Sequence, residues 1–146
     1  MTNARKNLKF LSVAVVVFAI ISCAKGLIDI FWTFTNLKEL PEGVTETVAM
    51  VTAIILAVIS VVLLLPRLYV GIKGIKVANH PDSSKGHIVW AVILTVIAVL
   101  ALIDPVSNLI KNFNLTSNIL DVVNLALDVL IYGLYAKYAM QVSKAA

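Results

Sequence analysis

Charged residues are scarce in this chain, and their scarcity excludes a soluble globular domain. Only 14% of the 146 residues are Asp, Glu, Lys or Arg, whereas 60% are hydrophobic and the mean hydropathy is +0.97. Soluble domains carry about 25% charged residues. Polar stretches are also too short for a second domain, so we expect one membrane domain over residues 1–146.

Cysteine and histidine are almost absent, which excludes several kinds of site. One cysteine cannot form an internal disulfide, and the two histidines, His80 and His87, match no metal-ligand spacing. We expect both to be solvated loop residues. Haem ligation would need histidines within apolar helices. Motifs for zinc proteases, phosphate loops and serine nucleophiles are lacking, so we expect no enzyme activity, no metal and no cofactor.

Long apolar runs fill most of what remains. Four of them reach the ~20 residues that cross the hydrocarbon core of a bilayer, at residues 8–32, 47–69, 88–110 and 119–138. The segments between them are too short to fold separately. The sequence therefore predicts an all-α integral membrane four-helix bundle, built from two hairpins.

Proline and small residues add detail to these runs. We expect Pro66 and Pro105 each to bend or end a helix. The stretch Gly71–Lys76, which reads Gly-Ile-Lys-Gly-Ile-Lys, has the pattern of a helical extension in the headgroup region. The second run also has a small residue at every fourth position, which predicts close packing against another helix: Ala49, Ala53 and Ala57.

The uneven placement of the cations predicts the orientation. Nine of the twelve Lys and Arg lie near the termini or from the end of the second run to the start of the third. Because cytoplasmic segments carry the excess of Lys and Arg, we expect both termini in the cytoplasm. No Arg-rich face with interleaved aromatic residues indicates nucleic-acid binding. We expect four of the cations to contact lipid headgroups: Arg67, Lys73, Lys76 and Lys85.

Carboxylates within the apolar runs are the chemically unusual residues. Asp128 lies near the middle of the bilayer, where a charge is costly and indicates function by default. Lys25 and Asp29 lie four residues apart in the first run, so they can pair. We expect these polar faces to meet in a cavity that opens outward. The candidate ion, proton or interhelical polar site has six members: Asp128, Asp121, Asn124, Lys25, Asp29 and Asp104.

Structural interpretations remain open for the same residues. Asn118 and Asp121 have the spacing of a helix capping box. The Lys25 side chain can reach the headgroups, and a protonated Asp128 can hydrogen-bond between helices. Cys23 ends an Ile-Ile-Ser-Cys sequence typical of a lipoprotein cleavage box, although the apolar run continues beyond it.

The Gly-Ile-Lys-Gly-Ile-Lys stretch, followed by Pro-Asp-Ser-Ser-Lys-Gly and an apolar helix, resembles small, uncharacterised bacterial tetraspan membrane proteins. The resemblance implies a bacterial plasma-membrane protein and brings no activity or site residues with it. From the residues, we expect a non-enzymatic accessory or self-associating membrane subunit, either a homo-oligomer or bound to a membrane partner. The alternative is a small cation- or proton-coupled transporter or channel that uses the intramembrane carboxylates.

Overall fold

The computed structural model describes residues 1–36, 42–111 and 116–146. Its regular structure within these ranges is helical. Four candidate membrane spans, long and apolar enough to cross a bilayer, correspond to α1, α2, α3 with α4, and α5. The predicted all-α architecture with four such helices is therefore confirmed. The helices are α1 (Asn3–Thr35), α2 (Glu46–Asn79), α3 (Gly86–Ala101), α4 (Ile103–Lys111) and α5 (Thr116–Ala145).

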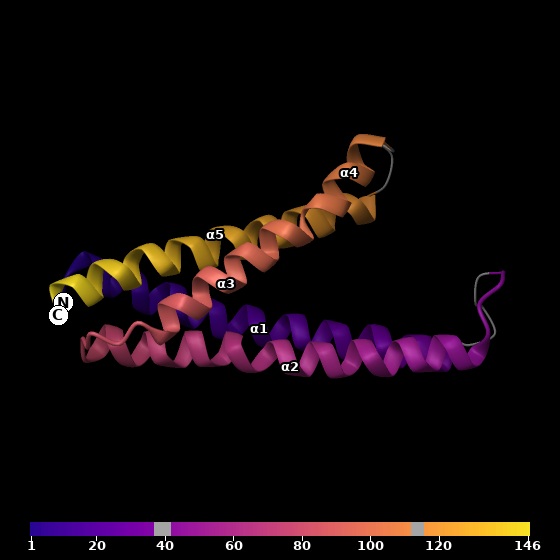
Figure 1. Ribbon diagram of the computed structural model, residues 1–146, viewed down its shortest axis with the longest axis horizontal. Helices are drawn as coiled ribbons and strands as arrows, with labels where there is room; N and C mark the ends of the chain where they lie inside the picture. Colours follow the sequence, from indigo (N-terminus) through magenta and orange to yellow (C-terminus); the bar gives the residue numbers. More distant parts are fainter. Residues whose placement is uncertain (37–41, 112–115) are drawn as a thin grey trace.

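The helices form two arms that meet at one end (Figure 1). In one arm α1 packs along α2, and in the other α5 packs along α3 and α4. Both chain termini and the connection between α2 and α3 lie where the arms meet, which we call the closed end. The arms diverge toward the C-terminal end of α1 and the start of α5, which we call the open end.

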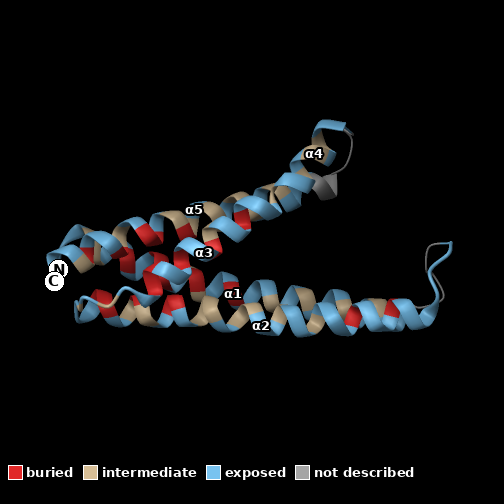
Figure 2. Ribbon diagram, in the orientation of Figure 1, coloured by how far each residue is buried: buried red, intermediate tan, exposed pale blue. Residues whose placement is uncertain are grey.

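Buried side chains gather at the closed end (Figure 2). There the side chains of all four spans pack together into one core. The core cluster comprises Leu8, Leu11, Val15, Val70, Val77, Ala78, Ile88, Ala91, Leu94, Tyr132, Tyr135, Ala136, Ala139 and Val142. Many large apolar side chains elsewhere are exposed, as expected for a surface that faces acyl chains.

Within the α1–α2 arm, the alanine pattern behaves as predicted. Ala49 and Ala53 are buried, with exposed fractions of 8% and 4%, and Ala57 is half-buried. Small residues at this spacing let the two helix backbones approach closely. The pattern therefore stabilises the arm itself.

The two prolines within the spans have different effects. Pro66 does not end its helix, because α2 continues from Glu46 to Asn79 and includes the Gly-Ile-Lys-Gly-Ile-Lys stretch. Membrane helices tolerate proline where neighbouring groups satisfy the freed carbonyl. Near Pro105 the expected break is present, since α3 ends at Ala101 and α4 begins at Ile103.

Two glycines in that stretch allow close packing at the closed end. Gly71 lies against the Val16 side chain and the Ser12 carbonyl of α1, and Gly74 lies against the Ser12 hydroxyl and the Tyr135 ring. A methyl group at either position would overlap these atoms. The expected helical extension is thus present, and its glycine face belongs to the core.

The Arg5 side chain holds α1 to the end of α2. Its Nε donates to the Ala78 carbonyl at 2.8 Å, and a terminal guanidinium nitrogen donates to the Asn79 carbonyl at 2.6 Å. Carbonyls in the last turn of a helix have no partner within that helix, and a cation there also complements the helix dipole. Arg5 therefore caps α2 from a neighbouring helix.

Gly74→Ala should destabilise the folded protein by about 1–3 kcal/mol, the range for overpacking a core, because the added methyl group meets Ser12 and Tyr135. Thermal denaturation in detergent measures the loss as a lower Tm. Gly133→Ala on α5 is the matched control, since nothing lies within 4 Å of the added carbon, and its Tm should not fall. Equal Tm values for the wild-type and Gly74→Ala proteins would contradict the close packing.

Candidate functional site

A polar cavity of about 470 Å³ lies between the two arms. Five of the six candidate residues line it, although the sequence alone could place them only on separate helices. Pro105 of α4 also lines the cavity, so its wall is formed by α1, α2, α4 and α5. The polar and charged lining residues are Ser22, Lys25, Asp29, Arg67, Asp121, Asn124 and Asp128.

Asp104 is the candidate that lies outside the cavity. It is exposed in the first turn of α4, whereas the next residue, Pro105, lines the cavity. Successive residues of a helix point about 100° apart, so a wall that uses Pro105 turns Asp104 away. The capping box suggested for Asn118 and Asp121 depends on the Asn118 side chain, which lies outside the described residues.

Arg67 is a cavity residue that sequence reasoning placed elsewhere. Its half-buried side chain lines the same cavity as Asp128, and its expected contact with lipid headgroups stays a prediction. Its Nε is buried and has no hydrogen-bond partner among the described residues. The sequence places Arg67 directly after Pro66, which was expected to bend or end the helix, so Arg67 was not included in the candidate site.

The charges around the cavity do not balance. Lys25 Nζ lies 3.8 Å from Asp29 Oδ2, and these side chains are 65% and 66% exposed, so the pair contributes about 0–1 kcal/mol. Arg67 remains to compensate both Asp121 and Asp128. With every group ionised, three carboxylates and two cations leave one negative charge in the cavity.

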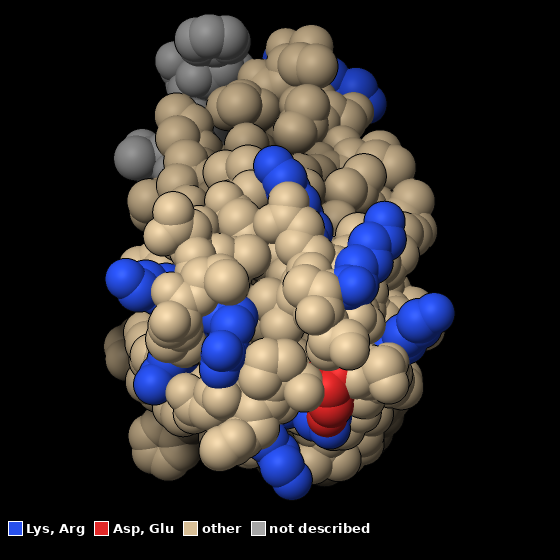
Figure 3. All heavy atoms as spheres, turned by 90° about the vertical axis from the view of Figure 1, so that its left-hand side faces the viewer, with Lys and Arg blue, Asp and Glu red and all other residues tan. Residues whose placement is uncertain are grey.

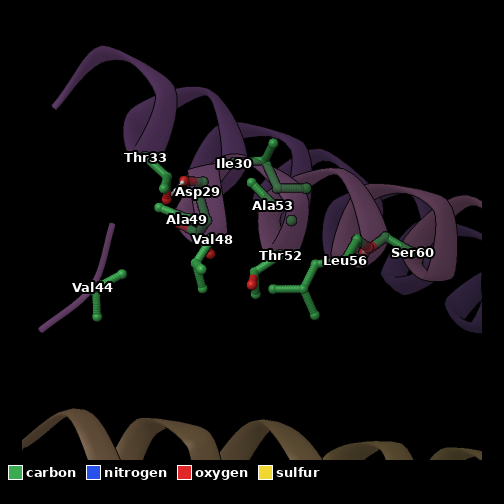
Figure 4. A pocket seen from close by; sticks show the side chains of 11 residues that line it. Asp29, Ile30, Thr33, Val44, Val48, Ala49, Thr52, Ala53, Leu56 and Ser60 are labelled. Carbon is green, nitrogen blue, oxygen red and sulfur yellow. Dashed lines mark hydrogen bonds between the residues drawn. The ribbon is translucent and has the colours of Figure 1, made fainter. Parts of the chain in front are cut away.

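The polar cavity continues toward the open end. An apolar cavity of about 530 Å³ shares Gly26 and Asp29 with it, and its side chains project from the face of the α1–α2 arm turned toward the other arm (Figure 4). A smaller cavity of about 210 Å³ shares Ser60 with the apolar cavity and Arg67 with the polar one. We call these three adjoining cavities the groove. It runs from the open end to Arg67 and Asp128.

Aromatic side chains follow Asp128 along α5, where the groove stops. Tyr132 and Tyr135 are buried, with exposed fractions of 3% and 0%. They lie one and two helical turns beyond Asp128 on the same face. The polar face of α5 therefore changes from acids and an amide in the groove to phenols in the closed end.

His87 is buried at the closed end, so the expectation of a solvated loop residue is wrong for this histidine. It lies in the first turn of α3, and its ring packs edge-on against Tyr135. Its Nδ1 lies 2.8 Å from the Tyr135 hydroxyl, which donates to the Val70 carbonyl at 2.8 Å. The other histidine, His80, is exposed just after α2, as expected. The His87–Tyr135–Val70 joint thus links α3, α5 and α2.

No family model, curated protein or solved structure matches this chain. The helices themselves support its description as a small four-span membrane protein.

Arg67 and Asp128 should be energetically coupled, because they face one cavity and one compensates the other. In a double-mutant cycle, Arg67→Met and Asp128→Asn should each lower Tm in detergent, and together they should cost less than their sum. We expect a coupling free energy of about 0.5–3 kcal/mol. The exposed pair, tested as Lys25→Met and Asp29→Asn, is the control and should couple by less than about 1 kcal/mol. Additive effects of the Arg67 and Asp128 changes would show that these charges do not interact.

Proposed function

We propose that this chain is a non-enzymatic multi-pass plasma-membrane protein that binds a proton or small cation in the groove and moves it across the bilayer. The observation that carries the proposal is the gathering of charged side chains from α1, α2 and α5 around one cavity. A charged residue at the centre of a spanning helix costs about 2.5–3.5 kcal/mol by insertion scales. Such a cost is ordinarily met only where a function needs the charge.

The single unbalanced negative charge supports a ligand with one positive charge. Asp128 lies at the inner limit of the groove, and the Asn124 side chain lines the same wall one turn away. A carboxylate and an amide oxygen are suitable oxygen ligands for a small cation, and the carboxylate alone is sufficient for a proton. In this proposal Asp128 binds the ion. The positive charge of Arg67 competes with the ion for the Asp128 carboxylate and so lowers the affinity of Asp128 for the ion.

Charge at the closed end supports an outward-facing groove. Figure 3 shows that end face on, and Lys and Arg side chains far outnumber acidic ones there. Cytoplasmic segments of membrane proteins carry such an excess. With the closed end in the cytoplasm, ions would enter the groove from outside.

A second candidate function is that of an accessory or self-associating subunit. Lys25 and Asp29 are about two-thirds exposed, and charged groups at membrane depth must face water or protein. A helix from a second copy of this chain, or from a membrane partner, could take the place of water around these two charged side chains. Native mass spectrometry from nanodiscs distinguishes the cases, since this candidate requires a stable oligomer or a bound partner.

Flux through proteoliposomes tests the transport proposal. Asp128→Asn should keep the fold, because an amide closely matches a carboxylate in shape, but it should reduce pH-dependent flux of H⁺, Na⁺ or K⁺ to the level of empty liposomes. Asp104→Asn is the matched control, because Asp104 lies outside the groove, and its flux should equal that of the wild type.

Two results would contradict the transport proposal. One is wild-type protein that conducts none of these ions under either orientation of the gradient. The other is an Asp128→Asn protein with wild-type flux. Absence of flux together with a stable oligomer would favour the accessory subunit instead.

A further inference from the structure

One ring nitrogen of His87 has no role in the closed-end packing. The Tyr135 hydroxyl uses its proton toward Val70, so its oxygen accepts from Nδ1–H of His87. This pattern assigns the neutral Nδ1–H tautomer and leaves a lone pair on Nε2. That Nε2 atom is buried and has no hydrogen-bond partner among the described residues.

An unpartnered buried nitrogen is rare enough to need an explanation. The great majority of buried polar side-chain atoms have a hydrogen-bond partner. The His87 side chain is fully buried, with an exposed fraction of 0%. Imidazole is also the side chain that gains and loses a proton near neutral pH. The free lone pair on Nε2 is therefore a proton-binding position.

We propose that His87 binds a proton at Nε2 and that this protonation releases the closed end. The proton comes from water and forms a bond with the Nε2 lone pair; no protein bond breaks, and the ring gains one positive charge. In the closed arrangement this charge has no hydrogen-bond acceptor at Nε2 among the parts of the chain that the structure describes, and it lies at the positive end of the α3 dipole. A buried charge without a partner is costly, so the protonated ring favours an arrangement in which Nε2 reaches water.

The groups that face His87 offset only part of this cost, because burial outweighs the favourable contributions of Asp82 and the Ser84 backbone to the protonated ring. Lys73 faces the ring from α2, Asp82 and the Ser84 backbone from the segment before α3, and Tyr135 from α5. Lys73 Nζ bonds Asp82 Oδ2 at 2.8 Å, so their charges largely offset each other. That bond and the Ser84 N–H keep the pKa of Asp82 below its ordinary value, so Asp82 stays ionised while His87 titrates.

This inference goes beyond the proposed function, because the release of the closed end needs no ion in the groove and no flux. It is tested by measuring the distance between α2 and α5 with spin labels on the full chain in nanodiscs. Labels at Lys76→Cys and Met140→Cys, in a Cys23→Ser background, report on exposed positions of these helices. The distance distribution is recorded at about pH 8 and about pH 4.5, the latter well below the ordinary histidine range because burial disfavours the charged ring.

We expect one short distance at the higher pH and a longer component that grows as the pH falls. His87→Asn keeps a neutral donor near the position of Nδ1 but cannot take the proton, so it should keep the short distance at both pH values. His80→Asn is the matched control, and it should respond like the wild type. An unchanged wild-type distance, or the same pH response in His87→Asn, would overturn the proposal.

Histidine-selective nitrogen NMR of the wild-type chain provides a second test if His87→Asn fails to fold. The chain has only two histidines, so their signals are easily separated. His87 should show the neutral Nδ1–H tautomer at about pH 8 and should become protonated in step with the distance change. Protonation of His87 without a distance change would contradict the proposal.

Discussion

The hydrogen bonds from His87 to Tyr135 and from Tyr135 to Val70 are the interaction on which the arrangement of the arms depends. They link three helices where the arms meet, and Gly74 brings α2 close enough for Tyr135 to pack there. Interhelical hydrogen bonds in membranes contribute on average about 0.6 kcal/mol. The joint therefore specifies the geometry more than it stabilises it, and a change of one proton is sufficient to disturb it.

Divergence of the arms beyond this joint turns interhelical polar residues into the lining of a groove. In a parallel bundle Asp121, Asn124 and Asp128 would bond to side chains of the facing helices. The ion pairs among the described residues are Lys25–Asp29 and Lys73–Asp82. Neither of them joins one arm to the other. The same face of α5 continues as Tyr132 and Tyr135 in the core. One helix face thus provides both the groove wall and its closure.

The sequence predicted the four helices well, because apolar runs of spanning length have few alternative structures. It also placed the candidate acids on particular helix faces. It could not show that the arms diverge, since that depends on contacts between distant residues such as Gly74 and Tyr135. Arg67 was left out of the candidate site, and His87 was wrongly expected in a loop, for a related reason. Arg67 follows Pro66 and His87 follows Gly86, and both preceding residues are typical of helix ends or loops. In the folded chain α2 nevertheless continues past Pro66, and α3 already begins at Gly86.

We infer that a water-accessible groove enters the membrane from the open end. It is tested most directly by labelling introduced cysteines with an impermeant thiol reagent on intact cells, in a Cys23→Ser background. Asn124→Cys lines the polar cavity, whereas Leu130→Cys, with Leu130 58% exposed in the structure, lies on α5 outside it. We expect labelling of Asn124→Cys from outside and none of Leu130→Cys. Protection of Asn124→Cys, or equal labelling of both, would contradict it.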